Sequence, residues 1–135
     1  MTRTRKTVVV VDDDDSVRRS LQRLIRSVGL NVEAFASAEE FLRSAAQPAP
    51  GCLLLDLQLP GMSGLELLER LLLEGRAIPV VFITAYGSDR SRELAARAGA
   101  VAFLQKPFEE KALLDAVART LGASPPGMGD PPANC

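Results

Sequence analysis

The sequence predicts an α/β protein in which one parallel β-sheet is covered by helices on both faces. The apolar runs at 7–11, 53–55 and 80–83 show no polar alternation, which is typical of strands buried on both sides. Segments with helical periodicity lie between such runs, so that five strands alternate with five helices. This order favours right-handed crossovers and a doubly wound sheet. A chain of 135 residues is long enough to form one hydrophobic core without disulfides.

The strand at 7–11 is followed by a predicted amphipathic helix. Gly29 comes after its last apolar position, where a left-handed cap would end the helix, and Asp15 or Ser16 is a suitable N-cap. A further strand candidate covers residues 31–34. The apolar residues of the helix, at helical spacing, are Val17, Leu21, Leu24, Ile25 and Val28.

Two capping boxes predict the next two helices, one on each side of the strand at 53–55. Ser37 is followed three residues later by Glu40, and Ser63 by Glu66, a spacing at which each side chain can cap the other residue's backbone. The apolar faces of these helices are expected to include Phe41 and Leu42 in the first, and Leu65, Leu68 and Leu72 in the second.

The second half of the chain continues the alternation. A helix over 89–98 follows the strand at 80–83, ends near Gly99 and has Leu94 as its only large apolar side chain. A strand at 101–104 and a last helix ending at Leu121 complete a domain predicted over 1–122. Residues 123–135 are rich in proline and glycine, and we expect a tail or the stub of a linker there.

Composition excludes several classes of function. A net charge of −1 is unusual for a nucleic-acid binder, so no direct nucleic-acid binding is expected. The two cysteines, Cys52 and Cys135, have no zinc or disulfide spacing, and the absence of histidine excludes histidine nucleophile chemistry. The apolar run after Met1–Lys6 is too short for a signal peptide or a membrane span, so a cytoplasmic protein is expected.

Acidic and hydroxyl side chains follow three of the predicted strands. Asp12 and Asp13 come after the first strand, Asp56 after the third and Thr84 after the fourth, and strand ends of this kind share one crevice. Two unit charges about 4 Å apart repel by about 4 kcal/mol at an effective dielectric constant of about 20. A hard divalent cation removes this repulsion, and Mg²⁺ takes one or two carboxylates and keeps waters that phosphate oxygens can replace.

The four consecutive aspartates also have a purely structural interpretation. Acidic residues after a strand often cap the next helix, and Asp14 and Asp15 are assigned to that role. Asp12 and Asp13, which are closest to the strand end, are the candidate ligands. The register within four identical residues stays open from sequence alone.

Asp56, Lys106 and Thr84 complete the candidate chemistry. A carboxylate beside Mg²⁺ can attack phosphorus and form an acyl phosphate, which makes Asp56 a candidate nucleophile. Lys106 precedes Pro107, and a cis bond there could direct its ammonium back into the crevice. Taken singly, Lys106 is more typical of a solvated lysine, and Thr84 of a strand-end hydroxyl bonded locally.

Four motifs together resemble the receiver domains of two-component response regulators. They are VVVVDDDD, LLLDLQLPGMSGLELL, VVFITAYGS and AGAVAFLQKPF, in that order over about residues 7–121. The resemblance is strongest to receivers of the nitrogen-fixation and LuxR-like transcriptional regulators. It implies a flavodoxin-like sheet with strand order 2-1-3-4-5, and it implies a phosphoryl-accepting signalling domain rather than an enzyme.

The resemblance implies a role for each site residue. Asp56 would accept the phosphoryl group, and Mg²⁺ would be held by Asp13, Asp56 and the backbone carbonyl of Gln58, with Asp12 acting largely through water. Lys106 would pair with one phosphoryl oxygen and Thr84 would donate its hydroxyl to another.

The resemblance also implies a switch and a set of partners. Phe103 stands at the place of the family's switch aromatic, although it could equally be a core ring, and the output surface would be the helix at 89–98, the strand at 101–104 and the last helix. The donor would be a sensor histidine kinase or a phosphotransfer protein, and a phosphorylation-dependent homodimer is a candidate output. Ala102 stands where many receivers carry an acid, which argues against charged dimer contacts. Gln58 and Tyr86 occupy positions that tune dephosphorylation in the family.

Three other classes of protein have some of these features. A haloacid-dehalogenase-like phosphatase would use the Asp12-Asp-Asp14 pattern, but the chain lacks room for a substrate-selecting cap, and Asp56 would have no role. A pseudo-receiver would keep the fold without phosphorylation, although every expected site type is present. A dinucleotide-binding domain is disfavoured because no G-x-G-x-x-G follows the first strand.

Overall fold

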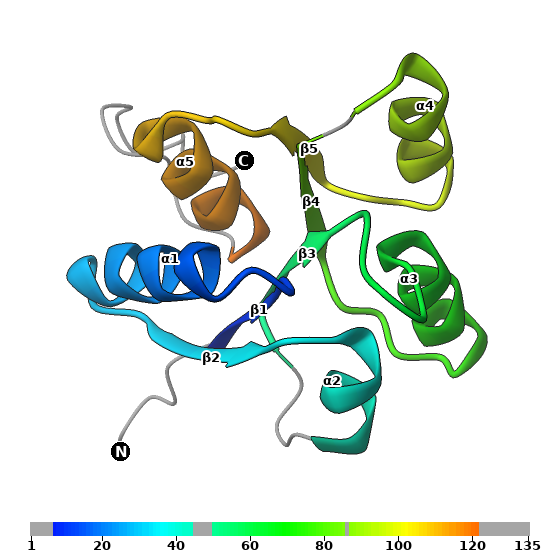
Figure 1. The fold of residues 1–135 in the computed structure, drawn as a ribbon, viewed down its shortest axis with the longest axis horizontal. Helices are drawn as coiled ribbons and strands as arrows, with labels where there is room; N and C mark the ends of the chain where they lie inside the picture. Colours follow the sequence, from blue (N-terminus) through cyan, green and yellow to red (C-terminus); the bar gives the residue numbers. More distant parts are fainter. Residues whose placement is uncertain (1–6, 45–49, 86, 122–135) are drawn as a thin grey trace, which may run out of the picture.

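The computed structural model describes residues 7–44, 50–85 and 87–121, and in them five strands alternate with five helices (Figure 1). The expected tail at 123–135, the basic residues Met1–Lys6 and Tyr86 lie outside the described residues. The elements are β1 (Thr7–Val11), α1 (Asp15–Ser27), β2 (Asn31–Phe35), α2 (Ala38–Ser44), β3 (Cys52–Asp56), α3 (Gly64–Leu73), β4 (Val80–Thr84), α4 (Asp89–Arg97), β5 (Ala102–Gln105) and α5 (Glu110–Thr120).

The five strands form one parallel sheet in the order β2-β1-β3-β4-β5, which confirms the predicted fold class. Val10 of β1 lies between Ala34 of β2 and Leu54 of β3, so β1 is an inner strand with a neighbour on each side. Because all strands run in the same direction, their carboxyl ends meet at one edge of the sheet. That edge carries the residues that follow β1, β3 and β4.

Helices cover both faces of the sheet (Figure 1): α1 and α5 lie on one face, and α2, α3 and α4 lie on the other. Successive strand residues face opposite layers, so Val8 and Val10 join the core under α1 and α5, while Val9 and Val11 join the core under α2 and α3. Full burial of one such side chain contributes about 1.5–3 kcal/mol. This two-sided burial explains why the strands read as continuous apolar runs.

The start of α1 differs from the sequence prediction. The capping role of Asp14 is confirmed, but Asp14 itself, and not Asp15 or Ser16, is the N-cap. Its carboxylate accepts hydrogen bonds from the backbone N–H groups of Ser16 and Val17 at 2.9 and 3.2 Å. Asp15 is the first helical residue, where its charge favours the positive end of the helix dipole. The helix ends as predicted, with Gly29 in a left-handed conformation at φ 83°.

The capping box that opens α3 is confirmed, but the predicted buried face of this helix is partly wrong. Ser63 Oγ accepts from the Glu66 N–H at 3.2 Å, and Glu66 Oε1 accepts from the Ser63 N–H at 2.8 Å. Leu72, predicted to pack on the sheet, is 52% exposed, whereas Leu68 is buried as predicted. Leu67 and Leu71 complete the buried stripe with Leu68, so the face of the helix that meets the sheet is turned away from the predicted one.

The helix α4 is anchored by small side chains. Its only fully buried residue is Ala95, and Leu94, which the sequence singled out, is half-buried. Burial of a single alanine contributes less than burial of a leucine, so α4 has little apolar area holding it to the sheet. None of the helices in the described ranges has the length and apolar character that a membrane span requires.

Candidate functional site

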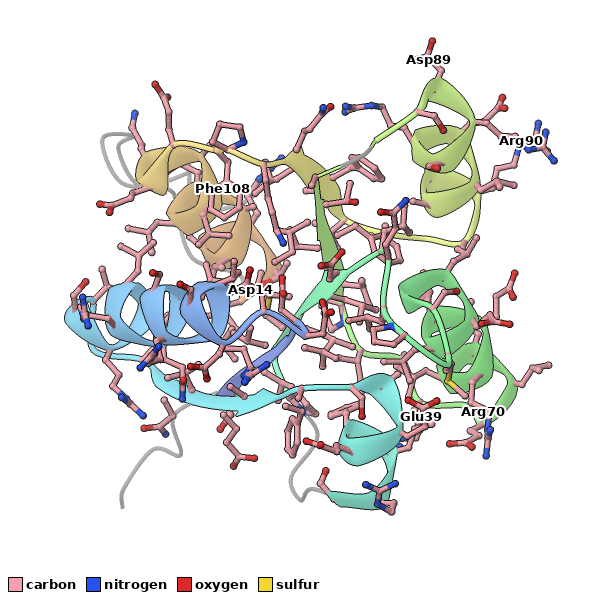
Figure 2. All side chains as sticks on the ribbon, viewed as in Figure 1. Asp14, Glu39, Arg70, Asp89, Arg90 and Phe108 are labelled. Carbon is pink, nitrogen blue, oxygen red and sulfur yellow. The ribbon has the colours of Figure 1, made fainter. Side chains whose placement is uncertain are left out.

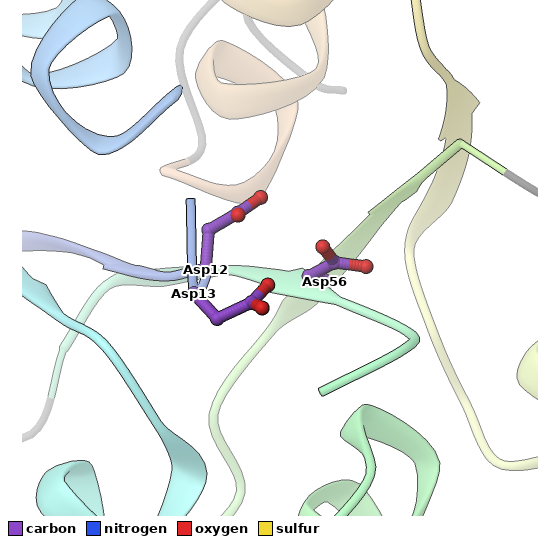
Figure 3. A group of neighbouring side chains, drawn as sticks. All are labelled: Asp12, Asp13 and Asp56. Carbon is purple, nitrogen blue, oxygen red and sulfur yellow. The ribbon is translucent and has the colours of Figure 1, made fainter. Parts of the chain in front are cut away.

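Three carboxylates converge at the carboxyl edge of the sheet (Figure 3). Asp12 and Asp13 follow β1, and Asp56 is the last residue of β3. Each offers an oxygen that lies within 4.8 Å of the others. Asp12 and Asp56 are buried, at 0% and 6% exposed, and Asp13 is exposed, so the cluster has a protein side and a solvent side.

Local hydrogen bonds set the position of Asp12. Its backbone N–H continues the sheet by donating to Phe35 O at 3.2 Å, and its Oδ1 accepts from the Asp14 N–H at 2.9 Å. Arg18 Nη1 donates to the Asp12 carbonyl at 2.7 Å, and Arg18 Nη2 also pairs with Asp15 at 3.0 Å. Arg18, in the first turn of α1, therefore fixes the position of the backbone at Asp12.

Lys106 brings its ammonium to both buried carboxylates. Its Nζ lies 2.9 Å from Asp12 Oδ2 and 3.3 Å from Asp56 Oδ2. The Lys106–Pro107 peptide bond is cis, as considered from the sequence, and the Lys106 N–H donates to the Thr84 carbonyl at 2.7 Å. The lysine is thus fixed at its backbone by β4 and at its head by the ends of β1 and β3.

The pKa values of Asp56 and Lys106 result from a competition between burial, which disfavours the charged form of each, and the contacts that favour it. Burial raises the pKa of Asp56 from 3.8 to about 6; the Gln58 N–H lowers it, Asp12 raises it further, and Lys106 lowers it. Partial burial alone would lower the pKa of Lys106, but the hydrogen bonds and charges of Asp12 and Asp56 outweigh it, so that this pKa is raised above 10.5. At neutral pH the site therefore holds an ionised but destabilised Asp56 beside a firmly protonated lysine.

The loop after Asp56 passes close to the nucleophile candidate. The Gln58 N–H donates to Asp56 Oδ1 at 3.0 Å, and the exposed Gln58 side chain is directed away from the core. Leu57 is fixed twice, by donation from its N–H to Ile83 O at 3.2 Å and by acceptance from the Gly64 N–H at 3.0 Å. A Cβ at Gly64 would collide with the Asp56 carbonyl, so only glycine permits this approach of α3.

Thr84 and Phe103 lie on neighbouring strands beside this site. Thr84 is fully buried and pairs in register with Gln105, and Phe103 pairs with Phe82 two residues earlier along the strands. The half-buried Phe103 ring lies 6.4 Å from the Phe82 ring, and the Arg92 guanidinium of α4 covers it at 4.7 Å. Phe103 therefore links the end of β5 with α4.

The donor set fits a hard divalent cation. Carboxylate oxygens from Asp12, Asp13 and Asp56 are all hard ligands, and the exposed position of Asp13 leaves the solvent side open for water or phosphate oxygens. Both Asp12 oxygens already have protein partners, Asp14 N–H and Lys106 Nζ. Both Asp56 oxygens also have partners, the Gln58 N–H and Lys106 Nζ, so the exposed Asp13 is the carboxylate with the most freedom to turn toward a cation.

Three residues around the site were not singled out from the sequence. Arg18 holds the Asp12 carbonyl, Arg92 covers Phe103, and Glu39 of α2 accepts from the Met62 N–H at 2.9 Å. For Arg18, the spacing from Asp15 was a usable signal, because residues three apart share a helix face. For Arg92 and Glu39 no local pattern pointed to partners 11 and 23 residues away.

Comparison with known proteins identifies a family and several relatives. The response regulator receiver domain family matches residues 8–118. Nodulation protein W of Bradyrhizobium diazoefficiens is 49% identical over 114 residues, which cover 84% of this chain and 50% of that protein. Transcriptional regulatory protein FixJ of Azorhizobium caulinodans is 42% identical over 117 residues, covering 87% and 56%. The chain thus spans about half the length of the curated relatives it matches.

Solved structures agree with the sequence comparison. The crystal structure of FixJ-N superposes with a TM-score of 0.81 at 38% identity, covering 89% of this chain and 96% of that one. Response regulator StyR superposes with a TM-score of 0.79 at 49% identity, covering 88% and 60%. A similar sheet, helix order and length are therefore shared with receivers of known structure.

Proposed function

The chain belongs to the response regulator receiver domain family, and from this premise we propose that Asp56 accepts a phosphoryl group from a phosphohistidine donor. The general function of this family is phosphoryl acceptance in signalling. The observation that carries the residue assignment is the contact of one ammonium, Lys106, with two buried carboxylates, Asp12 and Asp56. This contact supports the proposal, because a nucleophile at Asp56 would have its charge neutraliser beside it at the same sheet edge.

In the proposed transfer, an ionised Asp56 oxygen attacks phosphorus and forms a new O–P bond. The P–N bond to the donor imidazole breaks, and the imidazole keeps the electron pair and is protonated by solvent. No protein base is needed, because the attacking carboxylate is already ionised at neutral pH. Lys106 Nζ lies 3.3 Å from Asp56 Oδ2. It would pair with an oxygen of the phosphoryl group transferred to Asp56 and neutralise its negative charge.

The acidic cluster supports a Mg²⁺ site made of Asp13, Asp56 and the Gln58 carbonyl, with Asp12 contributing through water. Mg²⁺ bound there would neutralise the carboxylates and the transferred phosphoryl oxygens. The indirect role of Asp12 is supported by its complete burial and by its contact with Lys106 Nζ, which at 2.9 Å is shorter than the 3.3 Å contact of Asp56. Asp56 keeps one oxygen in a hydrogen bond with the Gln58 N–H, which orients the carboxylate.

The output of the switch is proposed to use Thr84, Phe103 and α4. A phosphoryl group on Asp56 would draw the Thr84 hydroxyl and Lys106 toward it. It would thereby shift the equilibrium between two arrangements of the strand ends. The weak apolar anchoring of α4 through Ala95 supports a movement of this helix. An effector domain outside residues 1–122, or a second copy of the chain, would recognise the changed surface of α4, β5 and α5.

A hollow beside Lys106 is a suitable docking position for the phosphohistidine donor. It has a volume of about 370 Å³ and lies between α1 and the start of α5, with Phe108 at its side (Figure 2). Its lining is mainly apolar and includes Val17, Leu21 and Leu24. Leu24→Arg is expected to slow transfer from a protein donor while leaving phosphorylation by acetyl phosphate unchanged.

The proposal is tested by mass spectrometry after incubation with acetyl phosphate and Mg²⁺. The wild-type chain should gain about 80 Da, the mass of one phosphoryl group, and Asp56→Asn should not. An equal adduct on Asp56→Asn would move the acceptor elsewhere. Catalytic turnover of phosphate esters, without a stable complex with beryllofluoride, would instead support a phosphatase.

A further inference from the structure

The loop between β3 and α3 is attached to the body of the protein at both of its ends. Leu57 at the first end bonds to Ile83 and Gly64. Leu59 is also buried in the core, whereas the side chains of Gln58 and Pro60 are exposed. Gln58 therefore lies between two buried leucines, and its N–H donates to Asp56 Oδ1. The course of the loop beyond Leu59 is set by what holds its second end.

The second end is held by a side chain from another element. Glu39 Oε2, on α2, accepts a hydrogen bond from the Met62 N–H at 2.9 Å. The two residues are 23 positions apart, and Figure 2 shows Glu39 on the side of α2 that faces α3. The Met62 N–H also lowers the pKa of Glu39, so this hydrogen bond favours the ionised carboxylate.

The loop backbone is shaped to receive this carboxylate. Gly61 has φ +74°, and a Cβ at this position would lie 2.6 Å from Glu39 Oε2. Gly75 has nearly the same conformation, φ +72°, but a Cβ there would meet nothing within 4 Å. Both glycines are favoured by their backbone conformation, and only at Gly61 would an added Cβ also push the Glu39 carboxylate away from its present position.

The neighbouring acid, Glu40, makes a different contact. Its Oε1 accepts from the Ala36 N–H at 3.2 Å, just before the start of its own helix, so it serves as a local cap. Glu39 and Glu40 are therefore adjacent residues with the same charge, both of which accept a backbone hydrogen bond. Only the bond of Glu39 reaches the loop that carries Gln58.

We propose that Glu39 is a positioning residue of the phosphorylation site, which holds the β3–α3 loop so that the Gln58 carbonyl can bind the metal ion. The proposal rests on the receiver function proposed above. Outer residues that orient metal ligands commonly change metal affinity by roughly 10- to 100-fold. Because Gln58 would be one ligand among several, we expect an effect of about tenfold, at the lower end of this range.

The test compares Glu39→Ala with Glu39→Gln and with the matched control Glu40→Ala. Amide hydrogen exchange of Met62, measured by NMR in metal-free protein, reports on the contact itself. Calorimetric titration with Mg²⁺ reports on its consequence. Glu39→Ala should accelerate Met62 exchange and weaken Mg²⁺ binding about tenfold. Glu39→Gln, which keeps an acceptor oxygen, should restore most of both.

The controls separate positioning from stability and from charge. Glu40→Ala removes the same charge and a helix cap, so it should lower stability but leave Met62 exchange and Mg²⁺ affinity unchanged. Gly61→Ala should weaken Mg²⁺ binding, whereas Gly75→Ala, with equal backbone strain, should not. Wild-type Mg²⁺ affinity in Glu39→Ala, with Met62 exchange accelerated, would overturn the proposal.

A failure of the underlying receiver function would have a different signature. It would appear as a wild-type chain that binds Mg²⁺ but acquires no adduct from acetyl phosphate. In that case Met62 exchange and Mg²⁺ affinity would still decide whether Glu39 positions the loop.

Discussion

Replacing Asp56 by asparagine is expected to stabilise the metal-free protein at neutral pH. Asp56 is 6% exposed, and its pKa is raised from 3.8 to about 6, chiefly by burial. The folded state therefore holds a proton on Asp56 more tightly than the unfolded state does. At pH 7 the ionised carboxylate costs stability, and asparagine has a similar shape without the charge.

The magnitude follows from the two pKa values. One pKa unit corresponds to about 1.4 kcal/mol, so the difference between 3.8 and about 6 corresponds to about 3 kcal/mol at most. This value already includes the attraction of Lys106, 3.3 Å away, and it is an upper bound because asparagine replaces a protonated aspartate imperfectly. We therefore expect Asp56→Asn to raise the free energy of unfolding by about 1–3 kcal/mol above pH 7.

The same two pKa values determine how the stability difference varies with pH. A folded pKa raised above the unfolded value means that stability increases as pH falls from about 6 to 3.8. The difference between the wild type and Asp56→Asn should therefore be full above about pH 7 and shrink toward zero near pH 4. Subtracting the two curves removes the titration of the other carboxylates, which both proteins share.

The assay is urea unfolding in EDTA, followed by far-UV circular dichroism, at several pH values between 4 and 8. Circular dichroism is suitable because the chain has no tryptophan. A variant that is less stable than the wild type at pH 7.5, or a difference that does not vary with pH, would refute the electrostatic reasoning. Saturating Mg²⁺ should reduce or reverse the difference, since only the wild type keeps the full ligand set.

Three further perturbations follow from the site and its surroundings. Lys106→Ala should lower the free energy of unfolding by about 1–3 kcal/mol at pH 7, because two buried carboxylates lose a charged partner; unchanged urea midpoints would contradict this. Arg92→Ala should lose about 0.5–1 kcal/mol, the value of a cation–π contact at an exposed site, here with Phe103 at 4.7 Å. Arg90→Ala, on the outer side of α4 (Figure 2), is its control and should change stability less. Ser63→Ala should lower the thermal midpoint through loss of about 1 kcal/mol of capping, and an equal midpoint would show that the capping box is dispensable.

The elements of the fold were predictable because their signals are local. Continuous apolar runs indicated strands buried on both faces, and β1 occupies the predicted residues, Thr7–Val11. The capping box at Ser63 and the glycine stop at Gly29 also depend only on neighbouring residues, and both are confirmed. The strand order and the family were predicted from four motifs that occur in a fixed order along the chain, because each motif alone is weak evidence.

The errors arose where neighbouring residues are chemically alike. Four successive aspartates can each cap a helix, and the choice of Asp14 is made by where β1 ends and the chain turns. In α3, leucines at 65, 67, 68, 71, 72 and 73 leave the helix apolar on most sides. Packing on the sheet then selects Leu67 and Leu71 for burial and leaves Leu72 exposed.

The sequence by itself determined the period of each element and placed acidic residues at the ends of alternate strands, because propensity and periodicity act over a few residues. That the strand ends share one crevice was predicted, but only the tertiary structure decided which side chains bond to one another there and around it. Lys106 reaches Asp12 across 94 positions, and Glu39 reaches Met62 across 23. Such contacts follow from how the crossovers stack the elements in space, and no local pattern in the chain encodes that stacking.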